Sequence, residues 1–182
     1  AFSFANYFGL YYIPGDLAYV FENSSENQYF GVNGEYTQRL TKTFKDLKRF
    51  WDIQSEDMVM VAMHGKMMYN RDRLVQLFQL YGNDLATSEW AADYVIALLD
   101  GIPQYRNGDH PIFTFNAYAA SATDFIPPYG PLPNKITMGD GIMDAYTGLG
   151  FEDVAPQAIL AHEFAHQVQF AIGTFDNPIS ET

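Results

Sequence analysis

The residues with the clearest chemical potential lie in the stretch AHEFAHQVQF, at positions 161–170. His162, Glu163 and His166 fit the pattern H-E-x-x-H. Residues four apart share one face of a helix, so both imidazoles reach a single metal ion. Glu163 follows the first histidine and points beside the metal, where a carboxylate can take a proton from water. The spacing predicts a site for Zn²⁺, with His162 and His166 as ligands and Glu163 as general base.

A helix must hold these residues, and its ends are marked in the sequence. Asp153 stands at an N-cap position, Pro156 falls in the first turn, and Gly173 follows the last periodic residue. Burying two imidazoles and a carboxylate costs several kcal/mol unless something pairs with them, and a divalent metal would do so. We expect a largely buried helix, because the histidine stripe (Ile159, His162, His166, Phe170) is flanked by the apolar stripe Leu160, Phe164, Val168.

Two strand patterns precede the motif helix. The segment IFTFNAYAAS at 112–121 alternates and is rich in aromatic residues, and KITM at 135–138 is a second strand signal. Between them, the proline-rich segment IPPYGPLP at 126–133 predicts an extended, stiff loop. Segment 111–173 is therefore expected to supply edge strands and the motif helix.

Residues 1–110 are expected to form a scaffold of helices and strands. Leu40, Phe44, Leu47 and Trp51 recur at helical spacing. The remaining expected elements are a buried strand at 57–65, a helix at 71–81 with Asn70 as N-cap, and a helix at about 89–99. The aromatic first thirty residues, with a turn signal at 14–16, predict irregular strands over the core. Of the other histidines, His64 is expected to be structural and His110 to be an exposed surface residue.

Composition limits the class of protein. A chain of 182 residues, 48% of them hydrophobic, can bury one substantial core, so 1–182 is expected to be a single domain. A net charge of −12 argues against nucleic acid as a partner. Cysteine is absent, and no apolar run reaches the roughly 20 residues of a membrane span. The compartment stays open, with a secreted or periplasmic location slightly favoured.

Three segments together resemble the gluzincin metallopeptidases. These are FNAYA, then NKITMGDGIM, then AILAHEFAH, and they cover about residues 112–172. The match is to small soluble gluzincins, to the related prenyl-protein and membrane-protein proteases, and to the bacterial neutral zinc metallopeptidases, in which H-x-V-Q often continues the motif helix. The resemblance implies an α+β, zincin-like fold, in which a mixed twisted sheet is packed on helices and has a substrate-binding edge strand.

The resemblance also implies roles for individual residues. The strand Asn116, Ala117, Tyr118 and Ala119 would lie at the sheet edge beside the zinc and bind an extended peptide or protein substrate through backbone hydrogen bonds. Small residues at 117 and 119 would let the peptide approach. Zinc would polarise the scissile carbonyl, and Glu163 would activate water and pass its proton to the leaving amine. The expected activity is that of a zinc-dependent endopeptidase.

The chain departs from the gluzincin pattern at the third ligand, a Glu on a later helix. Only sixteen residues follow His166, and they offer Asp176 and Glu181. Because Ser180, Glu181 and Thr182 read like the start of another helix, we expect the chain to be the N-terminal portion of a longer protein that carries the ligand Glu further on. Metzincins are excluded by Gln169 and Ile172, and Asp176 leaves an aspzincin as a weaker alternative.

Two alternatives to an active enzyme remain. A non-catalytic zincin-fold domain would use its edge strand only to bind peptides, although it would have no need for the base Glu163. An inactive fragment would follow if the third ligand lies beyond residue 182. Substrate specificity and oligomeric state stay open at this point.

Overall fold

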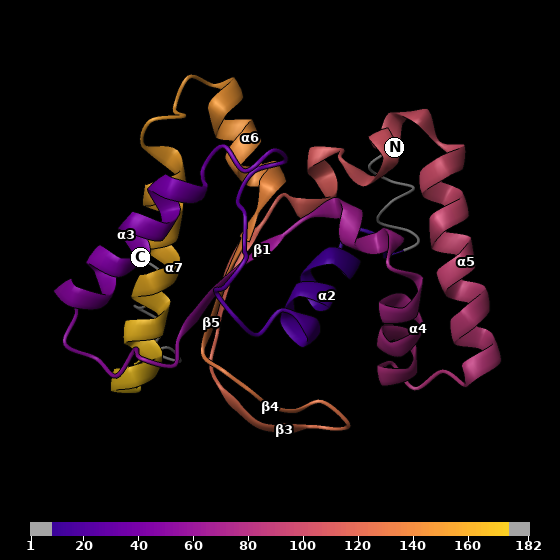
Figure 1. Cartoon of the computed structure of the whole chain (residues 1–182), viewed down its shortest axis with the longest axis horizontal. Coiled ribbons are helices and arrows are strands. Elements are labelled where there is room, and N and C mark those ends of the chain that lie inside the picture. Colours follow the sequence, from indigo (N-terminus) through magenta and orange to yellow (C-terminus); the bar gives the residue numbers. More distant parts are fainter. Residues whose placement is uncertain (1–8, 175–182) are drawn as a thin grey trace.

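A three-stranded mixed sheet with helices on both faces organises the chain, as Figure 1 shows for this computed structural model, which describes residues 9–174. The expected α+β class is confirmed. The elements in chain order are α2 (Ile13–Phe21), α3 (Thr37–Phe50), β1 (Val59–Met63), η1 (Gly65–Tyr69), α4 (Arg71–Leu80), α5 (Leu85–Gly101), η2 (Pro103–Gly108), η3 (Pro111–Thr114), β2 (Ala117–Ala120), β3 (Thr123–Ile126), β4 (Gly130–Leu132), β5 (Lys135–Gly139), α6 (Asp140–Gly148) and α7 (Ala155–Ile172).

Strand β5 is the centre of the sheet, whose order is β1-β5-β2. It runs parallel to β1, with Val61 opposite Thr137, and antiparallel to β2, with Ala119 opposite Ile136. Every residue of β5 is buried, as expected for a strand covered on both faces. Strand β2 is therefore an edge strand of this sheet, and the 135–138 strand signal is confirmed.

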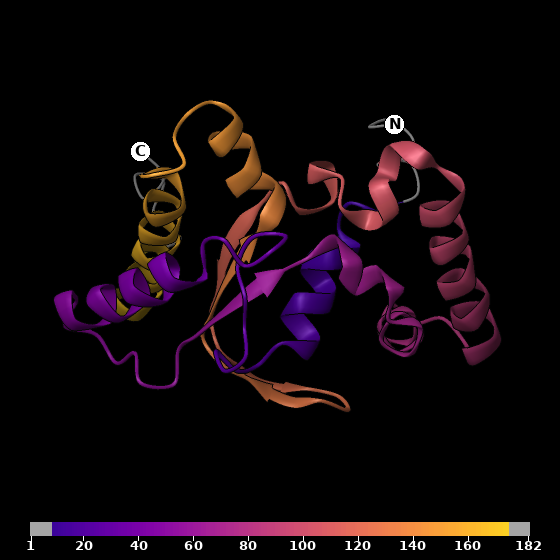
Figure 2. The same cartoon turned by 45° about the horizontal axis from the view of Figure 1, so that its top comes forward.

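Two hydrophobic clusters lie on opposite sides of the sheet. One joins α2 to α4 and α5, and the other joins α3 and α7 to the strands. In Figures 1 and 2, α3 and α7 lie together on one side, while α2 lies on the other with α4 and α5 beyond it. Helix α7 packs against β2, β5 and α3, which fixes the motif helix beside the edge strand.

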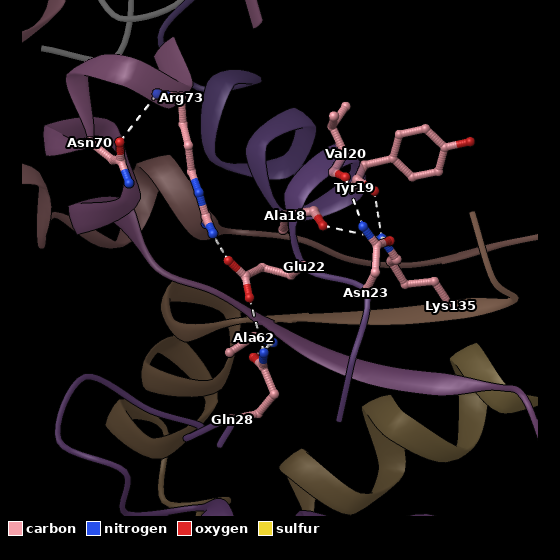
Figure 3. A network of polar contacts seen from close by, with 10 residues as sticks. All are labelled: Ala18, Tyr19, Val20, Glu22, Asn23, Gln28, Ala62, Asn70, Arg73 and Lys135. Carbon is pink, nitrogen blue, oxygen red and sulfur yellow. Dashed lines mark hydrogen bonds and ion pairs between the residues drawn. The ribbon is translucent and has the colours of Figure 1, made fainter. Parts of the chain in front are cut away.

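The β1 edge of the sheet is closed by side chains of the segment before α3. The backbone N–H of Met60 donates to Ser25 Oγ (2.8 Å), and that of Ala62 donates to Gln28 Oε1 (2.9 Å). Glu22 accepts from both Gln28 and Arg73, so the same segment is tied to α4 (Figure 3). Pairing of outer N–H groups with side chains is one way to block strand addition at an edge.

Lys135 anchors the start of β5 to helix α2. Its ammonium is fully buried and donates to the carbonyls of Ala18 (3.3 Å) and Tyr19 and to Asn23 Oδ1 (2.8 Å), as Figure 3 shows. The two carbonyls lie in the last turn of α2, where a cation offsets the helix dipole. Burial lowers the pKa of Lys135 to about 8, and the nearby Glu22 carboxylate opposes part of that decrease.

Several predicted elements are confirmed, and two predictions are wrong. The helix around Leu40, the strand at 57–65 and the helix capped by Asn70 all form, and Asn70 Oδ1 accepts from Arg73 N–H. Residues 13–21 form a helix instead of irregular strands, because Pro14 sits in the first turn, where it needs no N–H partner, and the apolar residues bury one face. Segment 126–133 is not a simple loop, since β3 and β4 pair there.

Two further predictions need smaller corrections. Within the expected strand at 112–121, only Ala117–Ala120 pairs in the sheet, and Pro111–Thr114 forms a 3₁₀ turn. The helix expected at 89–99 begins earlier, at Leu85, because Asp84 is its N-cap and accepts from Thr87 N–H.

Candidate metal centre

Helix α7 carries His162, Glu163 and His166, as predicted. Gly173 ends the helix with a left-handed φ of 70°, a conformation that glycine adopts without strain. The predicted N-cap is wrong: Val154 takes that position without a side-chain cap, and Asp153 instead faces Arg39 of α3, 3.3 Å away. Pro156 lies in the first turn, as expected.

The two histidines of the motif point their Nε2 atoms at each other. These atoms are 3.2 Å apart, and the rings are nearly perpendicular, at 87°. Two imidazole nitrogens bound to tetrahedral zinc, each at about 2.0–2.1 Å, are separated by about 3.3 Å. The observed pair therefore fits two ligand positions of such an ion, although an N–H···N hydrogen bond has a similar length.

Gln169 sets the tautomer of His166. Its side-chain Oε1 lies 2.7 Å from His166 Nδ1, and a carbonyl oxygen only accepts, so Nδ1 carries the proton. In neutral imidazole, this leaves Nε2 with its lone pair toward His162. Metal-binding histidines commonly have a second partner of this kind, which orients the ring and fixes the ligating nitrogen.

Glu163 is buried between α7 and the edge strand. Only 7% of the residue is exposed, and its carboxylate faces the backbone N–H of Ala119. Burial raises the pKa of the Glu163 carboxyl, while His162, His166 and the Ala119 N–H oppose part of the rise. A carboxylate in this environment is a stronger proton acceptor than one in water.

The expected burial of the whole motif is only partly correct. Glu163 is buried, but His166 is half-buried and His162 is exposed. The residues that face the sheet and α3 are those of a different stripe, namely Pro156, Leu160, Glu163, Phe164 and Gln167. The histidine pair therefore opens to solvent, so metal pairing is not required to offset burial of the imidazoles.

The structure brings the predicted substrate strand next to Glu163. Asn116 precedes β2 and its carbonyl accepts from Gly139 N–H (3.1 Å), so the peptide groups of Ala117 and Ala119 point away from β5. Ala117 is buried in the same hydrophobic cluster as Leu160 and Phe164 of α7, which packs on β2. Small side chains on this face thus let the motif helix approach the strand.

Gln167 is a positioning residue that the motif did not indicate. Its amide donates to the carbonyl of Ala120 (3.0 Å) and to that of Lys135 (2.8 Å), joining α7 to β2 and β5. The residue is 3% exposed, and it lies one turn after Glu163. The only sequence signal was a polar residue inside an otherwise apolar stripe.

A third ligand is not found within residues 9–174. No group of three His, Cys, Asp or Glu side chains there is arranged to hold a metal ion. The candidates Asp176 and Glu181, together with the expected final helix, lie outside the described residues. Catalytic zinc requires three protein ligands, and the described part of the chain offers two candidates, His162 and His166.

The other two histidines lie elsewhere. His64, expected to be structural, is buried, and its Nδ1 lies 2.6 Å from Asp140 Oδ2, while Tyr29 stacks on its ring. Asp140 Oδ1 also accepts from Gly31 N–H (3.1 Å), so the pair holds the segment before α3 against the sheet. His110 is half-buried instead of exposed, because its Nδ1 accepts from Ile112 N–H as the cap of η3.

Comparisons with models of protein families, with curated proteins and with solved structures found no match for this chain. The case for its chemistry therefore depends on its own residues. Within residues 9–174, none of the helices has the length and apolar character needed to span a bilayer.

Proposed function

We propose that this protein is a zinc-dependent endopeptidase of gluzincin type, with His162 and His166 as ligands and Glu163 as general base. The observation that carries the proposal is the 3.2 Å approach of the two Nε2 atoms, with the buried Glu163 carboxylate beside them on the same helix. Two further features support it: Gln169 orients the ring of His166, and the intervening carboxylate of Glu163 is buried next to the edge strand.

The chain's own residues support the chemistry of peptide hydrolysis. Zinc, when bound, would supply the positive charge that polarises the scissile carbonyl and eases loss of a proton from water. Glu163 accepts that proton on its carboxylate and returns it to the leaving amine. The outward peptide groups of β2, at Ala117 and Ala119, lie where an extended peptide can pair with the sheet edge.

The backbone N–H of Ala119 faces the Glu163 carboxylate and favours its charged form, which sets this N–H apart from the other outward backbone groups of β2. Substrate pairing at this edge would rely on the peptide group of Ala117 and on the carbonyl of Ala119. The side chains of Asn116 and Tyr118 belong to the opposite face of the strand from Ala117. They are then available to contact substrate side chains on the α2 side.

A non-catalytic peptide-binding domain is the second candidate, favoured by the presence of only two histidine ligands among residues 9–174. The edge strand would serve such a domain equally well. Its distinguishing property is binding of extended peptides without cleavage, even at full zinc occupancy.

The test is the zinc content of the purified chain together with cleavage of an unfolded protein such as casein. We expect about one zinc per chain, lost in the His162→Ala and His166→Ala variants, and zinc-dependent cleavage once a third ligand, which residues 9–174 do not supply, is present. His110→Asn is the matched control, because it replaces a histidine distant from the pair and keeps an acceptor for Ile112 N–H. Unchanged zinc content in the two alanine variants would refute the metal site, and full zinc without cleavage would favour the binding domain.

A further inference from the structure

An aromatic cleft lies on the opposite face of β2 from the motif helix. It has a volume of about 240 Å³, which is below the size of a typical drug-sized pocket and suits a single side chain. Its walls come from α2 and the two residues before it, from Met63 of β1 and from the segment 113–118. The aromatic residues that line it are Tyr11, Tyr12, Tyr19, Phe113, Phe115 and Tyr118.

Asp16 is the one charged residue among the described residues that line this cleft. It also lines a second cavity of about 560 Å³, bounded by α2, α4 and α5, and it is again the one charged residue there. Tyr12 is shared by both cavities, and Tyr81 from the second donates its hydroxyl to the Asp16 carboxylate. The two cavities thus meet at a single carboxylate among aromatic rings.

This combination selects a cationic group. Ring faces attract an ammonium or guanidinium through their quadrupole, and the carboxylate adds direct charge attraction. Burial raises the pKa of Tyr118 and of Tyr81, and the negative charge of Asp16 adds to the rise in both. The same field disfavours any anionic ligand. A net charge of −12 over the whole chain further favours the approach of cations.

The cleft lies beside the proposed catalytic group. Asn116 and Tyr118 line the cleft, and the N–H of the next residue, Ala119, faces the Glu163 carboxylate. A strand advances about 3.3 Å per residue, so the backbone of Tyr118 lies about 3.3 Å from that of Ala119 along β2, and that of Asn116 about 10 Å. An extended peptide on this edge presents every second side chain to the α2 face, where the cleft is.

We propose that the cleft between α2 and β2 receives a lysine or arginine side chain of the bound peptide, with Asp16 as counter-ion and the rings of Tyr12 and Tyr118 as walls. This inference rests on the proposed function in assuming an extended peptide at β2. The cleft adds a preference for substrates with a basic residue, which neither the H-E-x-x-H motif nor the edge strand β2 implies.

The test measures peptide binding without requiring cleavage. Acetylated alanine pentapeptides carrying lysine, norleucine or glutamate at the central position are titrated by NMR against the 182-residue chain and against the His162→Ala/His166→Ala double variant. We expect the lysine peptide to bind about tenfold more tightly than the norleucine peptide in both proteins, and the glutamate peptide to bind most weakly.

Two variants test the cleft itself. Asp16→Asn keeps the shape and should abolish the preference for lysine over norleucine. Tyr81→Phe is its matched control, because it removes the hydroxyl that contacts Asp16 and leaves the carboxylate. Tyr12→Leu removes an exposed ring and should weaken lysine binding by about two- to fivefold, even if Asp16→Asn does not fold.

Equal affinity for the lysine and norleucine peptides, or an unchanged preference in Asp16→Asn, would overturn the basic specificity. Failure of the basic specificity and failure of the proposed peptidase function give different results. A protein that selects lysine peptides but never cleaves them would refute the peptidase and retain the cationic cleft. A protein that cleaves casein without any basic preference would retain the peptidase and refute the cleft.

Discussion

The side-chain amide of Gln167 lies 3.0 Å from the carbonyl oxygen of Ala120, at the end of the edge strand. The same amide reaches the carbonyl of Lys135 at 2.8 Å, so one side chain holds α7 against both β2 and β5. One turn earlier on the helix, the Glu163 carboxylate faces the N–H of Ala119, the neighbouring residue on β2, and this N–H lowers its pKa. The position of the proposed base against the strand is thus set by contacts one turn apart.

Replacing Gln167 by leucine should destabilise the fold. The change leaves the buried carbonyl of Lys135 and the partly buried carbonyl of Ala120 without their donor, at a cost of about 1–3 kcal/mol in the free energy of unfolding. Urea unfolding followed by circular dichroism measures this difference. Gln38→Leu, on the exposed face of α3, is the control and should change stability little. A similar effect of both substitutions would show that the Gln167 amide does not join the helix to the sheet.

The sequence predicts those parts of the site that depend on neighbouring residues, and it does not predict those that depend on contacts between distant segments. The histidine spacing and the stop at Gly173 depend on residues within one helix, and both are present in the structure. The partners of Gln167 are more than thirty residues away in the sequence, so no local pattern predicts them. Tertiary contacts of this kind are found only once the strands are placed.

The predicted face of α7 was partly wrong for a physical reason. Apolar residues occur on nearly every side of this helix, as Ile159, Leu160, Phe164 and Phe170 illustrate, so their pattern does not select one buried face. The structure buries the stripe of Leu160 and Phe164 and leaves His162 exposed. Similarly, Pro14 and Gly15 suggested a turn, although proline is well tolerated where α2 begins.

Glu163→Gln should abolish cleavage while zinc content stays unchanged. Glutamine preserves the size of the side chain but cannot accept the proton from water, so the rate should fall by a factor of about a hundred or more. Casein cleavage and metal analysis of the same preparation provide the two readouts. Glu152→Gln, an exposed acid just before α7, is the control. Loss of zinc together with activity would instead identify Glu163 as a ligand.

Gln169→Leu should weaken zinc binding without removing either histidine. Without the Oε1 acceptor, His166 is no longer held in the tautomer that presents Nε2 to the metal. Loss of such a partner typically lowers metal affinity by about 10- to 100-fold. Competition with a chromophoric chelator measures the affinity, and Gln169→Glu, which keeps an acceptor, should restore it. Equal affinity in the parent and the leucine variant would contradict this orienting role.

The buried Lys135 predicts a specific dependence of stability on pH. Its pKa is about 8 in the folded chain, whereas an unperturbed lysine titrates near 10.4. Below about pH 8 both states are protonated, so this group gives no slope. Between about pH 8 and 10.4 the unfolded state binds a proton that the folded state has released, so the free energy of unfolding rises with pH. Above that window both states are neutral.

Lys135→Met isolates this contribution. The substitution leaves the acceptors at Ala18, Tyr19 and Asn23 without the ammonium, so it lowers stability at every pH. Urea unfolding at pH 7, 8, 9 and 10 gives the difference between parent and variant, and tyrosine ionisation, common to both proteins, cancels. We expect this difference to stay constant to about pH 8 and then to grow in favour of the parent. Lys45→Met, at an exposed lysine of α3, should show no such growth. A stability difference between parent and Lys135→Met that does not change with pH would contradict the lowered pKa of Lys135. It would mean that the hydrogen bonds to the three oxygens favour the charged ammonium as much as desolvation disfavours it.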